Sequence, residues 1–575
     1  MKEEEVRQDI CEVGKRLYEA KLVAASEGNI SVRLESGEIL ISPSGVCKGQ
    51  LEPHMMVRCM PDGTVCADDT SSFRPSSEIA LHVRIYQERP DVAAIVHAHP
   101  PQAIGFSVGP VAGKDQDAPV AVLEGTDFGG APVCPYAPPS SRALAESVVP
   151  YVQDFHAALL AKHGAVTWGT DLQQALAYME AVERAAQDWA NGMRPSNLPE
   201  AVCLSESKEA VRIVDQTLLP TSLKTIDLAS AQDLWDAIFQ LKVRGAPSIG
   251  VAAAWGYYVL ARQAAAAAKK ASAPGSPASS ASQEQLTSTS ASQEQHPDSS
   301  DFKAQLAKNA AFLNSARPTA VNLSWALERM NAVATKHAQA SAEELLILLE
   351  AEARAIHLET VCASNEIARL GAGLLEDGWG IITHCNAGPL ACLGYGTGQG
   401  PFYYAHDHGM KLQVYVDETR PLLQGARLTA YELMQAGIDA TLVCDNMAAQ
   451  LMREGRIQAC MVGCDRVAAN GDVANKIGTS GLAILAKHYG ISFYVLGPTS
   501  TIDLSCATGA DIVIEERDGS EITDLHFAQS IAPAGVSCYN PAFDVCDHSL
   551  VSAIITEWGI CRPPYGETLA ALFED

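Results

Sequence analysis

Long apolar runs, positive charge and paired cysteines are all scarce in this chain. No apolar run reaches the roughly 20 residues that a membrane-spanning helix needs. Acidic residues outnumber basic ones by 68 to 41, and the net charge of −27 makes nucleic acids and anionic membranes poor partners. The sequence therefore predicts neither nucleic-acid nor membrane binding, although a few cationic side chains in a cleft would still suffice for a small anion.

The 16 cysteines are scattered and form no CxxC pair. In a chain of this size such spacing predicts reduced thiols rather than a disulfide framework. The start, Met1–Glu5, is charged and lacks the apolar segment of a secretory signal. Together these features predict a cytoplasmic protein.

Length and composition predict an α/β protein of two or three domains. The 575 residues exceed what one core accommodates, and 47% hydrophobic with 19% charged residues is typical of α/β enzymes. A long helical pattern at 172–191 ends before Pro195 and Pro199, which predicts a boundary there. We expect domains over residues 1–200, 208–345 and 346–575.

One segment within the second domain differs sharply in composition. Residues 263–302 are mostly Ala, Ser, Gln and Pro, and the hexapeptide SASQEQ occurs at 280–285 and again at 290–295. Such a stretch lacks the large apolar side chains that a packed core needs, so we expect it to be disordered. Helical patterns resume on both sides, which indicates an insertion.

The last domain alternates short apolar runs with helical patterns, which predicts a parallel sheet covered by helices. The five apolar runs lie at 380–383, 412–416, 440–444, 459–462 and 493–496. Polar residues follow four of them, namely Cys385, Asp417 with Glu418, Asp445 and Asp465. Because parallel sheets bind ligands at the carboxyl ends of their strands, we expect these side chains to line a site.

Two histidines continue a predicted strand in the first domain. His97 and His99 follow the apolar run 93–96, and the alternation of side chains along a strand places both on the same face. A second predicted strand, 157–161, delivers His163. Three imidazoles that leave a fourth position open form the ligand set of a catalytic zinc ion, so the pattern predicts zinc as a cofactor.

Small, donor-rich turns in the same domain predict an anion site. Ser76 and Ser77 precede the amphipathic helix 79–87, whose first N–H groups favour a negative charge, although Ser76 also suits a helix N-cap. The residues expected to hold a phosphate are Gly28, Asn29, Ser44, Gly45, Ser76 and Ser77.

In this order the motifs resemble the class II aldolase/adducin family over roughly residues 5–195, nearest to its fuculose-1-phosphate and ribulose-phosphate branch. The resemblance implies an α/β/α domain in which His97, His99 and His163 bind zinc and Glu78 is the catalytic acid/base. It also implies that the small turns hold the phosphate of a ketose 1-phosphate, which is cleaved between C3 and C4.

A second carboxylate, Glu124, keeps another reaction open. A sister branch, the methylthioribulose-phosphate dehydratases, has a catalytic Glu at about this position and removes water from the same kind of substrate. The family also includes adducin heads, which bind the cytoskeleton. The intact turn ending at Glu78 favours the aldolase, and the retained histidines argue against an adducin role.

Cationic and amide side chains in the rear domains accompany Cys385 and Asp465. Arg244 lies in a turn with Gly245 and Ala246, before an Ala-rich helical pattern, and a guanidinium there suits a phosphate. Further candidate donors are Arg317, Gln424, Asn475 and Lys476. With a thiol and a carboxylate at strand ends, this set suggests a sugar-phosphate isomerase that works without a metal.

The stretch 211–563 closely resembles the methylthioribose-1-phosphate isomerase family, with long matches such as that at 466–478. The resemblance implies a small N-terminal subdomain, a Rossmann-like parallel sheet, and Cys385 and Asp465 as the catalytic thiol and carboxylate. Proton and hydride transfer both remain open. It also implies no cofactor and substrate contacts from Arg244, Gly245, Ala246, Arg317, Gln424, Asn475 and Lys476.

The two resemblances together predict a bifunctional enzyme. The rear half would isomerise 5-methylthioribose 1-phosphate or 5-deoxyribose 1-phosphate to the ribulose 1-phosphate, and the front half would cleave that ketose to dihydroxyacetone phosphate and an aldehyde. The alternatives are a front dehydratase of methionine salvage and a non-catalytic protein similar to adducin or to initiation-factor subunits. Since both families form oligomers, we expect a homo-oligomer whose only ligands are small sugar phosphates and zinc.

The composition of the insertion generates a first prediction. Deleting Ala271–Ser300 should leave both activities near normal, because a segment without large apolar residues contributes nothing to a core. Assays of isomerisation and of ketose cleavage on the shortened chain measure this, and a large fall in either activity would show that the segment does more than connect two helices.

Overall fold

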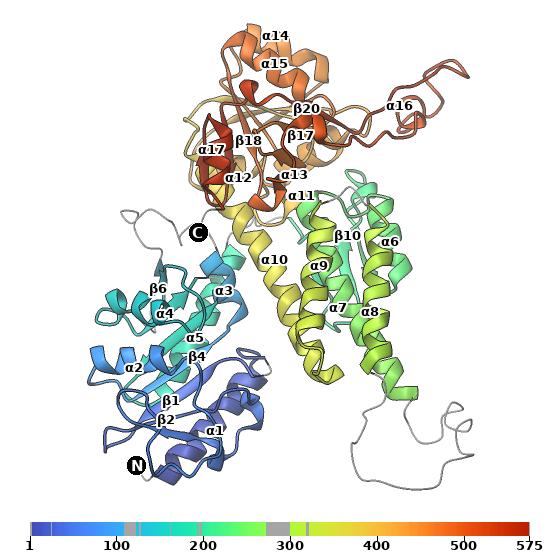
Figure 1. The fold of residues 1–575 in the computed structure, drawn as a ribbon. Coiled ribbons are helices and arrows are strands. Elements are labelled where there is room, and N and C mark those ends of the chain that lie inside the picture. Colours follow the sequence, from blue (N-terminus) through green and yellow to red (C-terminus); the bar gives the residue numbers. More distant parts are fainter. Residues whose placement is uncertain are drawn as a thin grey trace, which may run out of the picture. The chain divides into compact units, whose positions relative to one another are not determined.

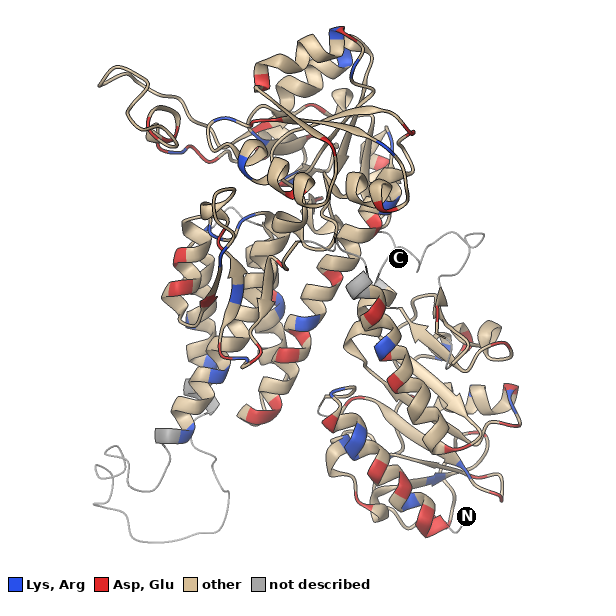
Figure 2. Cartoon of the chain, turned by 180° about the vertical axis from the view of Figure 1, so that it is seen from behind, with Lys and Arg blue, Asp and Glu red and all other residues tan. Residues whose placement is uncertain are grey.

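The computed structural model describes residues 3–573 except for 25, 109–121, 126–127, 162, 193–194, 196–197, 272–298 and 318–320. The chain divides into two compact units, coloured by sequence in Figure 1. Unit 1 comprises Met1–Met193 with His357–Cys362, and unit 2 comprises Arg194–Ile356 with Ala363–Asp575. Acidic and basic residues are interspersed within both units (Figure 2). Among the described residues, no helix combines the length and the apolar character needed to cross a membrane.

Unit 1 is built on an eight-stranded sheet of order β3-β2-β1-β4-β8-β7-β6-β5. Its strands are β1 Asn29–Arg33, β2 Ile39–Ile41, β3 Val57–Cys59, β4 Ala94–Ala98, β5 Val122–Leu123, β6 Ala131–Cys134, β7 Ala157–Leu160 and β8 Gly164–Gly169. Its helices are α1 Glu3–Glu19, α2 Ile79–Glu88, α3 Pro101–Val108, α4 Arg142–Ser147 and α5 Leu172–Gly192.

Helices cover both faces of this sheet, as the alternation along β4 requires. Ala94 and Val96 join the core that α1 and α5 complete, whereas Ile95 joins a separate core that contains Leu81 of α2 and Leu144 of α4. The predicted α/β/α architecture is therefore confirmed. The same alternation carries the side chain of His97 to the face of Ile95.

Unit 2 begins with a helical subdomain around a small antiparallel sheet of order β11-β10-β9. The strands are β9 Val202–Leu204, β10 Val211–Val214 and β11 Thr225–Leu228. The helices are α6 Ala231–Phe239, α7 Ala246–Ala271, α8 Ser299–Asn314, α9 Val321–Lys336 and α10 Ala342–Ala372. α6 starts with a capping box between Ser230 and Asp233, which satisfies the first free N–H groups of the helix.

The predicted disordered insertion at 263–302 is wrong at both ends. α7 continues through Ala271, because the run of alanines at 264–268 has the highest intrinsic helix propensity. α8 already starts at Ser299, and Phe302 and Leu306 anchor its first turns in the core. The rest of that prediction, 272–298, lies outside the described residues.

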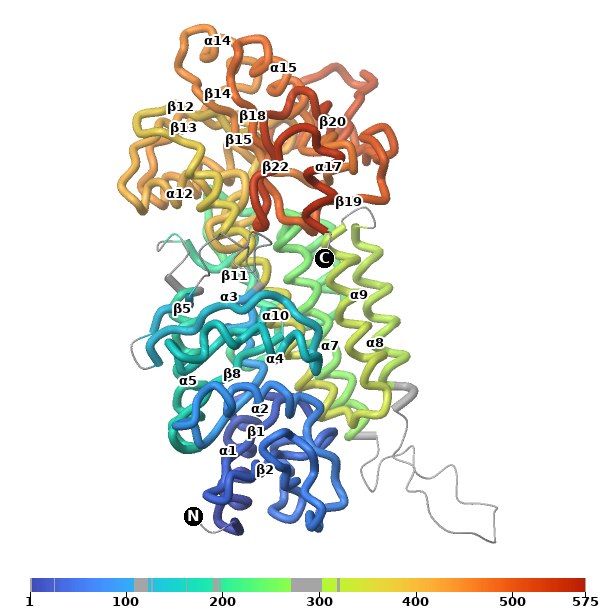
Figure 3. The backbone as a smooth tube through the Cα atoms, turned by 60° about the vertical axis from the view of Figure 1, so that its left-hand side comes forward, coloured from blue at the N-terminus to red at the C-terminus, as the bar shows by residue number. Residues whose placement is uncertain are grey.

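The second part of unit 2 contains a seven-stranded sheet of order β14-β13-β12-β15-β18-β21-β22, in which only the last pair is antiparallel. Figure 3 labels six of these strands, β12, β13, β14, β15, β18 and β22, in the yellow-to-red part of the tube. They are β12 Gly380–Thr383, β13 Gln413–Asp417, β14 Ala440–Val443, β15 Ala459–Val462, β18 Ser492–Leu496, β21 Ala553–Thr556 and β22 Gly559–Cys561. The Rossmann-like parallel sheet is thus confirmed.

Helices and a smaller sheet complete this part. The helices are α11 Pro389–Cys392, α12 Gly400–Asp407, α13 Ala430–Gln435, α14 Ala448–Arg453, α15 Thr479–Tyr489, α16 Ser520–Thr523 and α17 Tyr565–Ala570. A four-stranded sheet of order β19-β16-β17-β20 was not expected from the sequence. It consists of β16 Arg466–Ala468, β17 Val473–Lys476, β19 Ile502–Asp503 and β20 Phe543–Cys546.

The strand order of the seven-stranded sheet determines where the candidate catalytic residues of unit 2 lie. β12 has β13 on one side and β15 on the other, so the order of the sheet reverses next to β12. Such a reversal opens a crevice outside the carboxyl ends of the strands. Cys385 follows β12 and Asp465 follows β15, so both lie at this crevice.

Candidate functional sites

Three imidazoles converge at one end of the sheet of unit 1. His97 is the fourth residue of β4, His99 follows the strand, and His163 lies in the turn between β7 and β8. The ring centroids of His97 and His99 are 5.1 Å apart, and each lies 5.0 Å from the ring of His163. One ring nitrogen from each histidine lies within 4.8 Å of the others. The sequence-based expectation that these three residues meet is therefore correct.

The protonation of these rings suits a metal. His97 Nδ1 donates to the carbonyl of Ala165 at 2.9 Å, and its buried Nε2 is the ring nitrogen that lies 3.0 Å from Glu78 Oε2. Burial and the neighbouring rings of His97 and His99 lower the pKa of His163 to about 3, so its imidazole is neutral. Burial opposes protonation of His97, but the Glu78 carboxylate raises the pKa of that imidazole. A zinc ion would replace the proton, and three converging imidazoles leave a fourth ligand position open.

Glu78 lies against the same imidazoles, immediately before α2. Its Oε2 is 3.0 Å from His97 Nε2, and its Oε1 is 3.4 Å from His163 Nε2. Burial opposes ionisation of this carboxyl, but His97, His163 and the amide of Asn29 together hold the pKa of Glu78 well below its usual range. A carboxylate in this position can take a proton from, or return one to, a molecule held by the cluster.

A buried chain of polar contacts supports Glu78. Asn29 Nδ2 donates to Glu78 Oε2 at 2.9 Å, and the oxygen of the same amide contacts His82 Nε2. His82 Nδ1 contacts Ser31 Oγ at 2.6 Å, and Ser31 contacts the Tyr86 hydroxyl at 2.9 Å. The sequence reasoning missed His82, which lies in the first turn of α2, four residues after Glu78, the residue that precedes this helix.

The expected phosphate turns lie side by side. Pro43 pairs with Pro75 in an isolated β-bridge, which brings Ser44 and Gly45 next to Ser76 and Ser77. Ser76 Oγ accepts the N–H of Glu78 at 3.3 Å, and Ser77 Oγ contacts Ser140 Oγ at 2.9 Å. Gly28 has a φ of 71°, and a Cβ there would lie 2.8 Å from the His97 carbonyl, so the turn before Asn29 requires glycine.

Glu124 lies elsewhere in unit 1. It is exposed and lines a different hollow together with Phe128, Arg184 and Trp189. In the part of this unit that the structure describes, which excludes 109–121 and 126–127, no contact joins Glu124 to the three imidazoles.

In unit 2 all nine predicted residues line one cavity. Its volume is about 800 Å³ with the open mouth included. The nine residues are Arg244, Gly245, Ala246, Arg317, Cys385, Gln424, Asp465, Asn475 and Lys476. The helical subdomain contributes the first four and the sheets contribute the rest, so the crevice between these two parts of unit 2 is the candidate active site.

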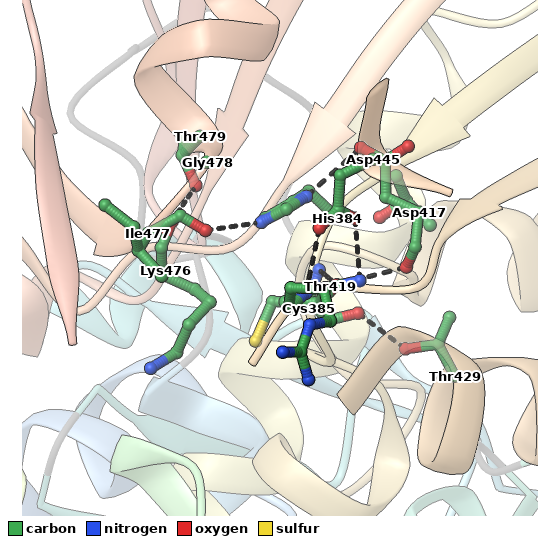
Figure 4. A network of polar contacts seen from close by, with 12 residues as sticks. His384, Cys385, Asp417, Thr419, Thr429, Asp445, Lys476, Ile477, Gly478 and Thr479 are labelled. Carbon is green, nitrogen blue, oxygen red and sulfur yellow. Dashed lines mark hydrogen bonds and ion pairs between the residues drawn. The ribbon is translucent and has the colours of Figure 1, made fainter. Parts of the chain in front are cut away.

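Cys385 is held in a strained backbone conformation at this cavity (Figure 4). Its φ is 66°, a left-handed value that costs a non-glycine residue about 1–3 kcal/mol. The Thr419 hydroxyl accepts its N–H at 2.9 Å, and Thr429 Oγ1 donates to its carbonyl at 2.7 Å. Burial raises the pKa of the Cys385 thiol, and the charges of Arg244 and Lys476 oppose that rise.

Asp465 and Lys476 complete the chemistry around the thiol. Burial raises the pKa of Asp465, and the charges of Lys476 and Arg317 counteract this rise in part, so the carboxyl favours its protonated form more than an exposed Asp does. Lys476 Nζ donates to the carbonyl of Ala542 at 2.7 Å and lies 4.6 Å from the centre of the Phe543 ring.

Arg244 offers an unused donor to the cavity. Its Nη2 donates to the carbonyl of Asn386 at 2.5 Å, whereas its Nη1 is buried without a hydrogen-bond partner. The next residue, Gly245, has a φ of 89°, and α7 starts at Ala246, which lines the same cavity. A guanidinium N–H beside a helix N-terminus is the arrangement that binds phosphate.

Sequence reasoning missed three further cavity residues. Glu515, Arg517 and Phe543 line the cavity, and Glu515 holds Arg317 through an ion pair of 3.7 Å. Glu515 and Arg517 lie in an irregular segment whose sequence shows no apolar periodicity, so no local signal connects them to the strand ends.

Comparisons with known proteins separate the chain into the same two parts. Residues 8–190 match the Class II Aldolase and Adducin N-terminal domain, and residues 272–563 match the Initiation factor 2 subunit family. A methylthioribose-1-phosphate isomerase of Symbiobacterium thermophilum is 51% identical over 65% of this chain and 96% of its own. A 5-deoxyribose 1-phosphate isomerase of Petrotoga mobilis is 48% identical over 65% of this chain and 99% of its own.

A solved structure agrees with these relatives. The crystal structure of 5-methylthioribose 1-phosphate isomerase from Pyrococcus horikoshii covers 66% of this chain and 97% of its own chain, with 37% identity and a TM-score of 0.56.

The imidazole cluster leads to a prediction about metal content. The purified chain should hold about one zinc ion, and His163→Ala should lower that content at least tenfold, since a site with two imidazoles binds zinc poorly. Elemental analysis after dialysis measures the metal. His54→Ala, which removes an exposed imidazole of the same unit, is the matched control. Equal zinc in the His163 variant and the native chain would rule out the cluster as the binding site.

Proposed function

The chain belongs to the Initiation factor 2 subunit family and carries a class II aldolase-type domain, and on this premise we propose that it is a bifunctional sugar-phosphate enzyme. Unit 2 isomerises 5-methylthioribose 1-phosphate or 5-deoxyribose 1-phosphate to the corresponding ribulose 1-phosphate. Unit 1 cleaves this ketose to dihydroxyacetone phosphate and an aldehyde. The names of the relatives support the first step.

The substrate explains why the isomerase site contains both an acid and a thiol. A phosphate on C1 locks the sugar ring, so the ring must be opened before hydrogen moves from C2 to C1. Asp465 protonates the ring oxygen as the ring opens, and Cys385, as the thiolate, takes the proton from C2 and returns it to C1. The Asp465 carboxylate then takes the proton of the C2 hydroxyl as the carbonyl forms there, which restores both groups. The raised pKa of the Asp465 carboxyl suits a proton donor.

The remaining cavity residues bind the substrate. Arg244 Nη1 and the first N–H groups of α7 hold the phosphate, and Lys476 stabilises the negative charge that develops beside the thiol. Leu241, Leu422 and Phe543 give part of the lining an apolar character, which suits a 5-substituent without a hydroxyl. A methylthio group and a plain 5-deoxy carbon both meet this condition.

In unit 1 the distances from Glu78 to the imidazoles carry the proposal. A bound zinc ion would supply polarisation of the ketose carbonyl. Glu78, which lies 3.0 Å from His97 Nε2 and is oriented by Asn29, moves the proton that the cleavage requires. The turns at Ser44 and Ser76 bind the phosphate. Aldol cleavage is favoured over dehydration because Glu78, rather than Glu124, lies at the cluster.

Independent sites should lose their activities separately. Cys385→Ser should lower isomerisation by about 10²–10⁴-fold, because a hydroxyl is far less acidic than a thiol, and leave cleavage of supplied ketose 1-phosphate unchanged. Coupled assays of the two steps measure this. In D₂O the native product should carry deuterium at C1. A product without deuterium would favour hydride transfer and contradict the role of Cys385 as the proton carrier.

The reaction of unit 1 can be identified from its product. With ribulose 1-phosphates as substrates we expect dihydroxyacetone phosphate, and Glu78→Gln should slow its release by about 10²–10⁴-fold at unchanged zinc content. Glu124→Gln is the matched carboxylate control and should remain within about twofold of native, as expected for an exposed residue. A dehydrated diketone phosphate as the product, with Glu124→Gln as the inactive variant, would assign a dehydratase instead.

A further inference from the structure

His384, the residue before Cys385, is buried between two fixed partners. Its exposed fraction is 1%. Its Nε2 lies 2.8 Å from the carbonyl oxygen of Ile477, and its Nδ1 lies 3.1 Å from Asp417 Oδ2. Figure 4 shows the imidazole spanning the gap between these two groups.

The chemistry of these partners fixes the number of protons. A carbonyl oxygen can only accept, so His384 Nε2 must carry a hydrogen. The second contact then needs another proton, either on Nδ1 or on the Asp417 carboxyl, because two facing lone pairs repel each other. In both forms the His384–Asp417 pair has no net charge. Burial raises the pKa of Asp417 to about 6. Burial also opposes protonation of His384, but the hydrogen bond and charge of Asp417 raise the pKa of this imidazole overall.

The other charged side chains near the His384–Asp417 pair form hydrogen bonds with backbone groups. Asp445 accepts the N–H groups of Thr419 and Arg420 at 2.7 and 2.8 Å, and Asp544 accepts those of Gly478 and Ser480 at 2.8 and 3.1 Å. Lys476 points its ammonium at Ala542. Asp417 is therefore the carboxyl that holds the imidazole of His384.

The pair connects the chain segments that carry the reactive groups. Its imidazole is adjacent to Cys385 at the end of β12, and the carbonyl that it binds follows Lys476 at the end of β17. The Asp417 segment also holds Cys385, because the hydroxyl of Thr419 accepts the Cys385 N–H and donates to the Asp417 carbonyl at 3.0 Å. Both Cys385 and Lys476 line the cavity.

We propose that His384 and Asp417 are positioning residues of the isomerase site, a pair with one retained proton that holds the Lys476 segment against the thiol of Cys385. Asp417 keeps the hydrogen of the imidazole on Nε2, where it binds Ile477. The inference rests on the proposed roles of Cys385 and Lys476, and it goes beyond them by naming what fixes their separation.

Two substitutions at one position test this. Asp417→Asn keeps both hydrogen bonds and the zero net charge, since the new amide donates to Nδ1, and kcat should stay within about fivefold of native. Asp417→Leu has a similar size but binds neither tautomer, which frees the imidazole to turn a lone pair toward Ile477. Its kcat should fall by about 100-fold, the usual cost of a misplaced reactive group.

The reactivity of Cys385 gives a measurement that a merely structural role would not change. Iodoacetamide labelling of the peptide that contains Cys385, followed against pH by mass spectrometry, reports the pKa of this thiol. In Asp417→Leu the midpoint should rise by about one pH unit, because the charge of Lys476 no longer supports the thiolate. In Asp417→Asn it should stay at the native value.

The outcomes separate this inference from the proposed function. Equal loss of kcat in both variants, or a native labelling midpoint in Asp417→Leu, would overturn the positioning role. Zinc content and ketose cleavage by unit 1 check that each variant is intact, and Asp417→Ala replaces the Leu variant if that chain does not fold. Full isomerase activity in Cys385→Ser would instead refute the proposed function, whatever the Asp417 series gives.

Discussion

The end of a β-strand is the constraint on which both sites depend. A strand fixes the direction of its side chains, and the first residue beyond its last hydrogen bond can turn toward a ligand without leaving a rigid frame. β4 directs His97 and His99 to one face, and β12 and β15 set Cys385 and Asp465 on either side of the point where the sheet order reverses. The strain at Cys385, with its φ of 66°, persists because this frame and two threonine hydroxyls hold it.

Buried polar groups at both sites exist in sets rather than alone. An isolated charge is very costly in a dry interior, so each is matched by partners. Glu78 is buried with two imidazoles and an amide, and the half-buried Asp465 has the charges of Lys476 and Arg317 near it. Arg244 Nη1 is buried without a hydrogen-bond partner, and Arg244 lines the cavity of unit 2, where an anion would satisfy this donor.

Local periodicity explains what could be predicted from the sequence. The five parallel strands and the meeting of His97, His99 and His163 follow from alternation and from polar residues after apolar runs. The mixed sheet around β17 could not be predicted because its strands have only two to four residues. Glu515 and His82 could not be identified as site residues from the sequence, because their roles depend on contacts with residues that are distant in the chain. The end of α7 and the start of α8 lie in low-complexity sequence, in which the high helix propensity of alanine still favours a helix.

Joining the two proposed reactions in one chain has a thermodynamic advantage, because the second reaction removes the product of the first. The aldose and the ketose have bonds of similar total energy. The isomerisation alone therefore reaches an equilibrium in which both sugars are present. Cleavage of the ketose into two smaller molecules removes the product, and mass action then pulls the isomerisation forward. Synthesis as one polypeptide keeps the two activities at a fixed ratio. Under the proposed function both sites bind the ketose 1-phosphate, and the proposed phosphate contacts differ: neutral turns at Ser44 and Ser76 in unit 1, and Arg244 with the start of α7 in unit 2.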